Sequence, residues 1–221
     1  YYTNATVPCP GAEHILLSFP KRFIPERTRI IPQPDSGYKY QSDGVSDAIF
    51  MSSRDGIHWR RFRDAWVRPG MDAGNWTHRS NMVAWGIART SSTEWSMYIS
   101  EHYGWTTNRL RRLAVRPWGF SAIHADFPGG ELLTHPLSFK GAALHLNAST
   151  SAAGSIRVEI QEADGKPIDG FAMADMNPWF GDELDAPITW KQGGGLARLA
   201  GRPIRFRIAM KDADLFALRF G

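Results

Sequence analysis

Ser53-Arg54-Asp55-Gly56-Ile57-His58-Trp59 is a short polar stretch between two runs with the composition of β-strands, residues 47–51 and 59–62. An Asp-Gly pair between such runs is the strongest short-range signal for a β-hairpin. The carboxylate of Asp55 can accept backbone N–H groups across the turn, and Gly56 can adopt the positive φ that the turn needs. The stretch therefore predicts an antiparallel hairpin, with Trp59 packed beneath the turn.

The composition is that of an ordinary globular protein, with 221 residues of which 43% are hydrophobic and 22% charged. This length suffices for one large domain or two small ones. No apolar run approaches the ~20 residues of a membrane-spanning helix, so we expect no membrane partner. Cys9 is the only cysteine, which excludes an internal disulfide and leaves the location open, secretion or export to the periplasm being compatible with it.

The chain is basic, with a formal net charge of +4 and 20 arginines against 6 lysines. Arginine favours planar, bidentate contact with carboxylates and phosphates. The sequence contains no helix-turn-helix, zinc-finger or aromatic RNA-binding signature, so we expect no nucleic-acid partner. Arginines that are solvated or paired with acidic residues, and arginines that bind an anionic polysaccharide, both remain open. The densest cluster comprises Arg109, Arg111, Arg112 and Arg116.

The pattern of the chain predicts an all-β fold in two parts. Residues 1–117 hold most of the Trp and His residues and predict irregular strands with long connections, including a loop over 25–39. No segment keeps a helical period over three turns. The strands expected in this part are 14–19, 46–52, 58–62, 82–90, 95–100 and 109–115.

Residues 118–221 predict an antiparallel β-sandwich. Ile156, Val158 and Ile160 alternate with polar residues, which is typical of a strand with one buried face. Asp164-Gly165 predicts a second tight hairpin turn, and the run of glycines over 193–195 predicts a flexible one. Strands spaced in this way by turns favour a sandwich. The strands expected here are 131–134, 143–147, 155–160, 188–191, 204–210 and 215–220.

The first part resembles the last portion of a five-bladed β-propeller of the glycoside-hydrolase type, a superfamily that includes invertase- and arabinanase-like enzymes. The second part resembles the β-sandwich that follows the propeller in bacterial proteins of this kind. The stretches that carry the resemblance are residues 14–20, 53–56 and 98–103 in the first part, and 129–132, 136–139, 151–155, 157–161, 164–168, 181–182 and 211–215 in the second.

A propeller of five blades needs about twenty strands, since each blade has four. Residues 1–117 can supply one blade or slightly more. The resemblance therefore implies that this chain is the C-terminal part of a larger protein. Its partners would then be the missing N-terminal propeller blades or another copy of the chain.

Glycosidic cleavage needs two carboxyl groups about 5–10 Å apart, one of them protonated. Glu101 is the first candidate, because it follows a predicted strand in a Trp-rich neighbourhood that would favour a protonated carboxyl group. Asp47 is the second. The alternatives are that Glu101 pairs with a neighbouring arginine and that Asp47 only ends a strand. Asp55 is assigned to the turn.

Aromatic and polar residues gather near Trp76, in the run Trp76-Thr77-His78-Arg79-Ser80-Asn81. Indole rings stack on pyranose faces, and polar side chains of this kind bind sugar hydroxyls. The alternative is a loop whose tryptophan fills the space between strands. The sugar-binding residues predicted from this pattern are Trp76, His78, Arg79, Asn81, Trp85, His102 and Tyr103.

The sequence predicts no metal site and no cofactor, because its seven histidines form no H-x-x-x-H or H-E-x-x-H pair. Asp164, Asp212 and Asp214 could together hold Ca²⁺, but capping of turns is the alternative role. The expected function is that of a glycoside-hydrolase-like protein that acts on, or binds, a polysaccharide or oligosaccharide. The alternative is a non-catalytic carbohydrate-binding or assembly module of a larger enzyme.

Overall fold

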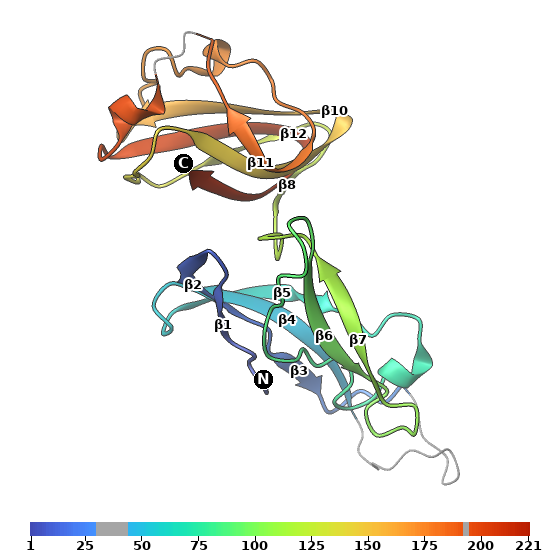
Figure 1. Cartoon of the computed structure of the whole chain (residues 1–221). Coiled ribbons are helices and arrows are strands. Elements are labelled where there is room, and N and C mark those ends of the chain that lie inside the picture. The colour runs from blue at the N-terminus through green and yellow to red at the C-terminus, as the bar shows by residue number, and fades with distance from the viewer. Residues whose placement is uncertain (30–43, 192–194) are drawn as a thin grey trace. The chain divides into compact units, whose positions relative to one another are not determined.

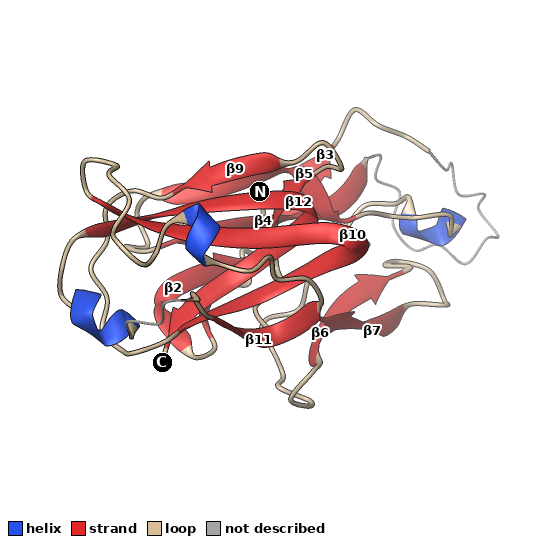
Figure 2. Ribbon diagram, turned by 90° about the horizontal axis from the view of Figure 1, so that it is seen from above, coloured by secondary structure: helices blue, strands red, loops and turns tan. Residues whose placement is uncertain are grey.

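The fold is all-β, as the sequence predicts, and its sheets are antiparallel. The computed structural model describes residues 1–29, 44–191 and 195–221. Its helical segments in these ranges are three short 3₁₀ turns, η1 (Ala73–Asn75), η2 (Met173–Asp175) and η3 (Leu196–Leu199) (Figure 2). No helix in the described ranges is long and apolar enough to span a membrane. The chain divides into two compact units, Tyr1–Pro117 and Trp118–Gly221.

The larger sheet of the first unit follows the chain as a meander (Figure 1). β2 (Ala12–Ser18) pairs with β1 (Val7–Cys9) on one side. β2 and β3 (Lys21–Ile24) pair with successive stretches of the same edge of β4 (Val45–Ser53). β5 (Trp59–Val67) pairs with the other edge of β4. Phe19, between β2 and β3, is fully buried against Phe50 and Trp66 and anchors the core of this sheet.

The predicted hairpin joins β4 and β5. One carboxylate oxygen of Asp55 accepts the backbone N–H groups of Ile57 and His58 at 2.9 and 2.7 Å, and Gly56 has a φ of 74°. The side chain of His58 and these backbone donors lower the pKa of Asp55. The indole of Trp59 donates to the carbonyl of Gly56 at 3.1 Å. The hairpin prediction is therefore confirmed down to its side-chain contacts.

The second sheet of the first unit is the hairpin of β6 (Trp95–Glu101) and β7 (Arg109–Val115), close to the predicted strands. The predicted strand over 82–90 is wrong: Val83 and Ala88 each make only an isolated bridge to β6. Gly86, between them, has a φ of 111°, which an extended strand does not adopt. The segment therefore separates from β6 after Val83 and meets it again at Ala88.

The second unit is built on two long strands. β10 (Leu144–Glu162) and β12 (Ile204–Phe220) pair with each other along most of their length. β11 (Asp182–Ile188) pairs with the other edge of β10, while β8 (Ile123–Ala125) and β9 (Gly130–Leu133) pair with successive stretches of β12. The separate strands predicted over 143–147 and 155–160, and over 204–210 and 215–220, are thus parts of single strands. The strand predicted over 188–191 ends at Ile188 and begins six residues earlier, at Asp182.

A register shift in the β10–β12 pair lies between Thr150 and Ser155. Gly154 is required there, because a Cβ at this position would lie 2.4 Å from the backbone oxygen of Asp212. On both sides of the shift, alternate residues of the long strands enter one apolar core, which includes Leu146, Ile156 and Phe206. The predicted Asp164-Gly165 turn is confirmed: Gly165 has a φ of 97°, and Asp164 accepts the N–H of Lys166 at 3.0 Å. The predicted loop over 25–39 and glycine turn over 193–195 lie largely outside the described residues.

Candidate functional site

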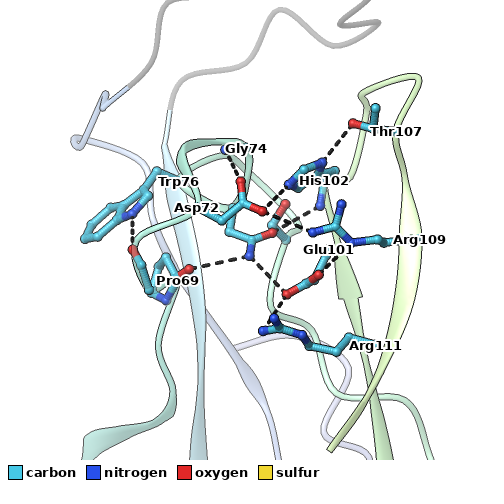
Figure 3. Close-up of polar contacts among 12 residues, drawn as sticks. Pro69, Asp72, Gly74, Trp76, Glu101, His102, Thr107, Arg109 and Arg111 are labelled. Carbon is cyan, nitrogen blue, oxygen red and sulfur yellow. Dashed lines mark hydrogen bonds and ion pairs between the residues drawn. The ribbon is translucent and has the colours of Figure 1, made fainter.

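Glu101 ends β6 and is buried, with 1% of its surface exposed. Its carboxylate receives the Nε–H of Arg109 at 2.8 Å and lies 3.1 Å from a guanidinium nitrogen of Arg111 (Figure 3). The amide of Asn75 donates to it at 3.2 Å. Both arginines come from the facing strand, β7, so the hairpin itself brings them to the carboxylate. Of the two roles considered for Glu101, its contacts are those of the residue paired with neighbouring arginines.

Asn75 links three segments of the first unit through its side chain. Its amide nitrogen donates to Glu101 and, at 3.4 Å, to the carbonyl of Pro69, and its amide oxygen accepts the backbone N–H of His102 at 3.2 Å. The amide of Asn81 in turn donates to the backbone oxygens of Asn75 and Ser46, at 2.9 and 2.8 Å. Both asparagines are buried. Asn81, predicted to bind sugar, therefore holds loops together.

Asp72 and His102 extend this network toward the surface (Figure 3). The carboxylate of Asp72 lies 2.9 Å from Nε2 of His102 and 3.0 Å from Arg109, and its other oxygen accepts the N–H of Gly74, capping η1. The His102 contact comes first among the causes that lower the pKa of Asp72. Nδ1 of His102 lies 2.8 Å from the hydroxyl of Thr107. A Cβ on Gly74 would lie 2.7 Å from the imidazole, so glycine lets the ring pack here.

Asp47 lies in a different ion pair, on β4. Arg22 of β3 donates to both of its oxygens, at 2.9 and 2.5 Å, and this contact raises the pKa of Arg22. The pair follows from the register, which places Arg22 opposite Asp47. None of the described contacts joins Asp47 to Glu101. The two predicted catalytic carboxylates therefore belong to separate networks.

A hollow of about 670 Å³ opens beside the Arg22–Asp47 pair. Among the described residues, its lining carries four arginines against two aspartates, with Trp76 as its aromatic residue. The indole of Trp76 is held by a hydrogen bond from Nε1 to the carbonyl of Gly70 at 2.7 Å. The charged and aromatic lining residues are Arg22, Arg27, Arg63, Arg68, Asp47, Asp64 and Trp76.

A second hollow, of about 430 Å³, includes Glu101 and Arg111 in its lining. Both hollows are lined by Arg68, Pro69 and Gly70. The short segment after β5 thus separates two adjoining depressions. We call the two together the paired groove.

The remaining predicted sugar-binding residues lie elsewhere. His78, Arg79 and Tyr103 contact one another: Arg79 donates to Nε2 of His78 and to the hydroxyl of Tyr103, each at 3.1 Å. Trp85 is 77% exposed, and its indole donates to the carbonyl of Thr6 at 2.9 Å. Neither Trp85 nor the His78 cluster lines the paired groove. The predicted binding residues thus divide among four places in the first unit: the first hollow, the Asn75 network, the His78 cluster and Trp85.

Sequence reasoning missed the residues that dominate the paired groove. Arg63 and Arg68 lie on or just after β5, whose alternation of charged and aromatic residues was visible in the sequence. Asp72 and Asn75 carried a weaker signal, the N-cap pattern of a short helical turn. Nothing in the sequence joined Asn75 to a glutamate 26 residues later.

The described residues contain no group of three or more His, Cys, Asp or Glu side chains placed to hold a metal ion. The three aspartates considered for Ca²⁺ do not gather. Asp164 caps its hairpin, and Asp214 lies 2.8 Å from Nδ1 of His124, whose pKa is raised by Asp214 and then by Asp126.

Comparisons with protein-family models, with curated proteins and with solved structures gave no match to this chain.

Proposed function

We propose that this protein binds an acidic polysaccharide or oligosaccharide through the paired groove, without cleaving it. The observation that carries the proposal is the first hollow, whose described lining residues combine an indole with four arginines and two carboxylates. Indole faces stack on sugar rings, and guanidinium groups bind carboxylate or sulfate substituents through two parallel hydrogen bonds. A basic, aromatic groove on a strand scaffold suits a ligand that is both a sugar and an anion.

Two features favour binding over hydrolysis. The oxygens of Glu101 are occupied by two guanidinium groups and an amide, so this carboxyl group is poorly placed to give a proton to a glycosidic oxygen. Asp47 is engaged on both oxygens by Arg22. Cleavage needs one carboxyl group to act as acid and a second as base or nucleophile. Of the functions considered, the non-catalytic carbohydrate-binding module therefore has the better support.

We propose further that the first unit is one blade, and the beginning of a second, of a propeller related to glycoside hydrolases. The run of β1, β2 with β3, β4 and β5 is an antiparallel meander in chain order, which is how a propeller blade is built. β6 and β7 would begin the next blade. In the second unit, the register shift halfway along β10 and β12 supports a sandwich, because both halves of these strands face one core.

The experiment is a binding titration with polygalacturonate, a sulfated polysaccharide and neutral xylan. We expect the acidic polymers to bind, more weakly as salt rises, and xylan not to bind. Trp76→Ala and Arg68→Gln should each weaken binding about tenfold or more. Trp85→Ala is the matched control, since it removes an exposed indole outside the groove.

Two results would overturn this proposal. Equal loss of affinity in Trp76→Ala and Trp85→Ala would remove the groove from the binding site. Release of new reducing ends that persists in a highly purified preparation and disappears in Glu101→Gln would restore the hydrolase hypothesis.

A further inference from the structure

β3 presents cationic side chains on both of its faces. Arg22 and Ile24 line the first hollow. Because successive side chains of a strand point to opposite sides, Lys21 and Phe23 face away from it. Lys21 is 5% exposed, and its ammonium lies 4.5 Å from the ring centre of Tyr2 and 5.8 Å from that of Phe23. A second cationic surface therefore lies behind the groove.

Lys21 is a largely buried residue, and its ammonium has no anionic counterpart in the described ranges 1–29, 44–191 and 195–221. Burial, and then the charge of Arg79, lowers the pKa of its ammonium group. Aromatic faces stabilise an ammonium only in part, and buried charges are ordinarily paired. The hydrogen-bonding capacity of this group therefore calls for an acceptor.

His78 adds a second donor to the same surface. Nε2 of His78 accepts the Nε–H of Arg79, so the proton of the neutral ring is on Nδ1. Burial, and then the charges of Lys21 and Arg79, lowers the pKa of His78, which favours the neutral ring. Nδ1 is buried and has no hydrogen-bond partner among the described residues. The ring lies edge-on to Phe23, with 4.3 Å between ring centres, which orients it beside Lys21.

Arg79, which follows His78 in the chain, has a strained backbone. Its φ of 65° is rarely adopted by a residue other than glycine. The conformation is maintained by the surrounding fold, since the N–H of Arg79 donates to the hydroxyl of Ser46 at 3.1 Å and its side chain reaches Tyr103. Strained residues held in this way are concentrated at binding sites.

We infer that Lys21 and His78, beside Arg79, form a binding site for an oxyanion. The donors offered there are the ammonium of Lys21 and Nδ1–H of His78. An oxyanion supplies the acceptor and the negative charge that these two groups lack among the described residues. Sulfate, phosphate and a sugar carboxylate share this chemistry. The site lies on the face of β3 opposite the groove and does not depend on the proposed function.

The test is a calorimetric titration of the whole chain with inorganic sulfate, with phosphate and with monomeric galacturonate, followed by NMR of the His78 ring nitrogens. We expect saturable binding and a shift of the Nδ1 resonance. Lys21→Met should weaken binding about tenfold or more. Lys211→Met is the matched control, because Lys211 also lies over an aromatic ring, 4.2 Å from the centre of Phe127, but in the second unit. The ligand with the highest affinity shows whether the site prefers sulfate, phosphate or a sugar carboxylate.

Equal affinities in the parent chain, Lys21→Met and Lys211→Met, or no saturable binding at millimolar concentration, would overturn the inference. If Lys21→Met does not fold, His78→Phe decides, since it keeps the packing against Phe23 and removes the Nδ1 donor, together with the Nε2 acceptor of Arg79. Trp76→Ala should leave sulfate binding unchanged. If Trp76→Ala loses polysaccharide binding but still binds sulfate, the result agrees with two separate sites. The proposal for the paired groove and the inference for the Lys21 surface can therefore fail independently.

Discussion

Replacement of Glu101 by glutamine should destabilise the first unit even though the shape of the side chain is kept. The parent carboxylate accepts from Arg109, Arg111 and Asn75, and it is 1% exposed. Glutamine keeps one acceptor oxygen but places an NH₂ group against at least one of these donors. Loss of a hydrogen bond to a charged group costs about 1.5–3 kcal/mol. Removal of one partner from a fully buried ion pair costs more, about 3–5 kcal/mol.

The lower range applies here, because the side chains of Arg109 and Arg111 are 46% and 60% exposed and can be rehydrated. We therefore expect the free energy of unfolding to fall by about 1.5–3 kcal/mol. Six of the nine tryptophans lie in the first unit, so their fluorescence during urea unfolding reports mainly on that unit.

Glu94→Gln is the matched control at the other end of the same hairpin. Glu94 pairs with Arg112 at 2.7 Å, but both side chains are nearly half exposed. Exposed pairs of this kind contribute about 0–1 kcal/mol. If both variants unfold at the urea concentration of the parent chain, the Glu101 network is not a determinant of stability, and the reasoning from its burial is refuted.

Other perturbations test the remaining structural arguments. Gly154→Ala should destabilise the second unit by about 1–3 kcal/mol, measured by urea unfolding followed by circular dichroism, because the new Cβ would meet the backbone oxygen of Asp212; an unchanged midpoint would contradict this. Asp214→Asn should lower the pKa of His124, measured by NMR titration, because Asp214 is the first cause of its elevation. While Asp214 is ionised, the contribution of this pair to stability should be fully present below the unfolded-state pKa of histidine and lost as the pH rises through the folded-state pKa of His124. Asp55→Ala should lower the melting temperature of the first unit, since two backbone N–H groups lose their acceptor; a melting temperature equal to that of the parent would count against the turn.

The parts of the fold that the sequence predicts are those set by local chemistry. The Asp55-Gly56 turn and the burial of Ile156, Val158 and Ile160 depend on residues close together in the chain, and both are found as predicted. The strand predicted over 82–90 failed because period alone does not reveal that Gly86 turns the chain out of the sheet. The prediction of two strands, 143–147 and 155–160, is wrong because the residues between Thr150 and Ser155 form an irregularity within one strand.

The candidate site was less predictable, because its contacts join distant parts of the chain. Arg22 meets Asp47 only through the register of β3 on β4, and Asn75 meets Glu101 only through the packing of a loop on the β6–β7 hairpin. The sequence identified the ionisable residues but not their partners. Without those partners, a buried glutamate that stabilises the fold cannot be distinguished from one that transfers a proton.

The charge distribution around β3 links the two proposals. On one face, Arg22 is neutralised by Asp47, and the remaining arginines of the first hollow face the space beside Trp76. On the other face, Lys21 has no carboxylate among its described contacts. A basic surface needed only for solubility would keep its cations in water, where they cost nothing to solvate. Burial of a lysine beside a histidine whose Nδ1 has no described partner costs stability, and binding of an anion would offset that cost. The same surface should therefore become more stable when its anion binds, and the melting temperature in sulfate, compared with that in chloride of equal ionic strength, should rise in the parent chain more than in Lys21→Met.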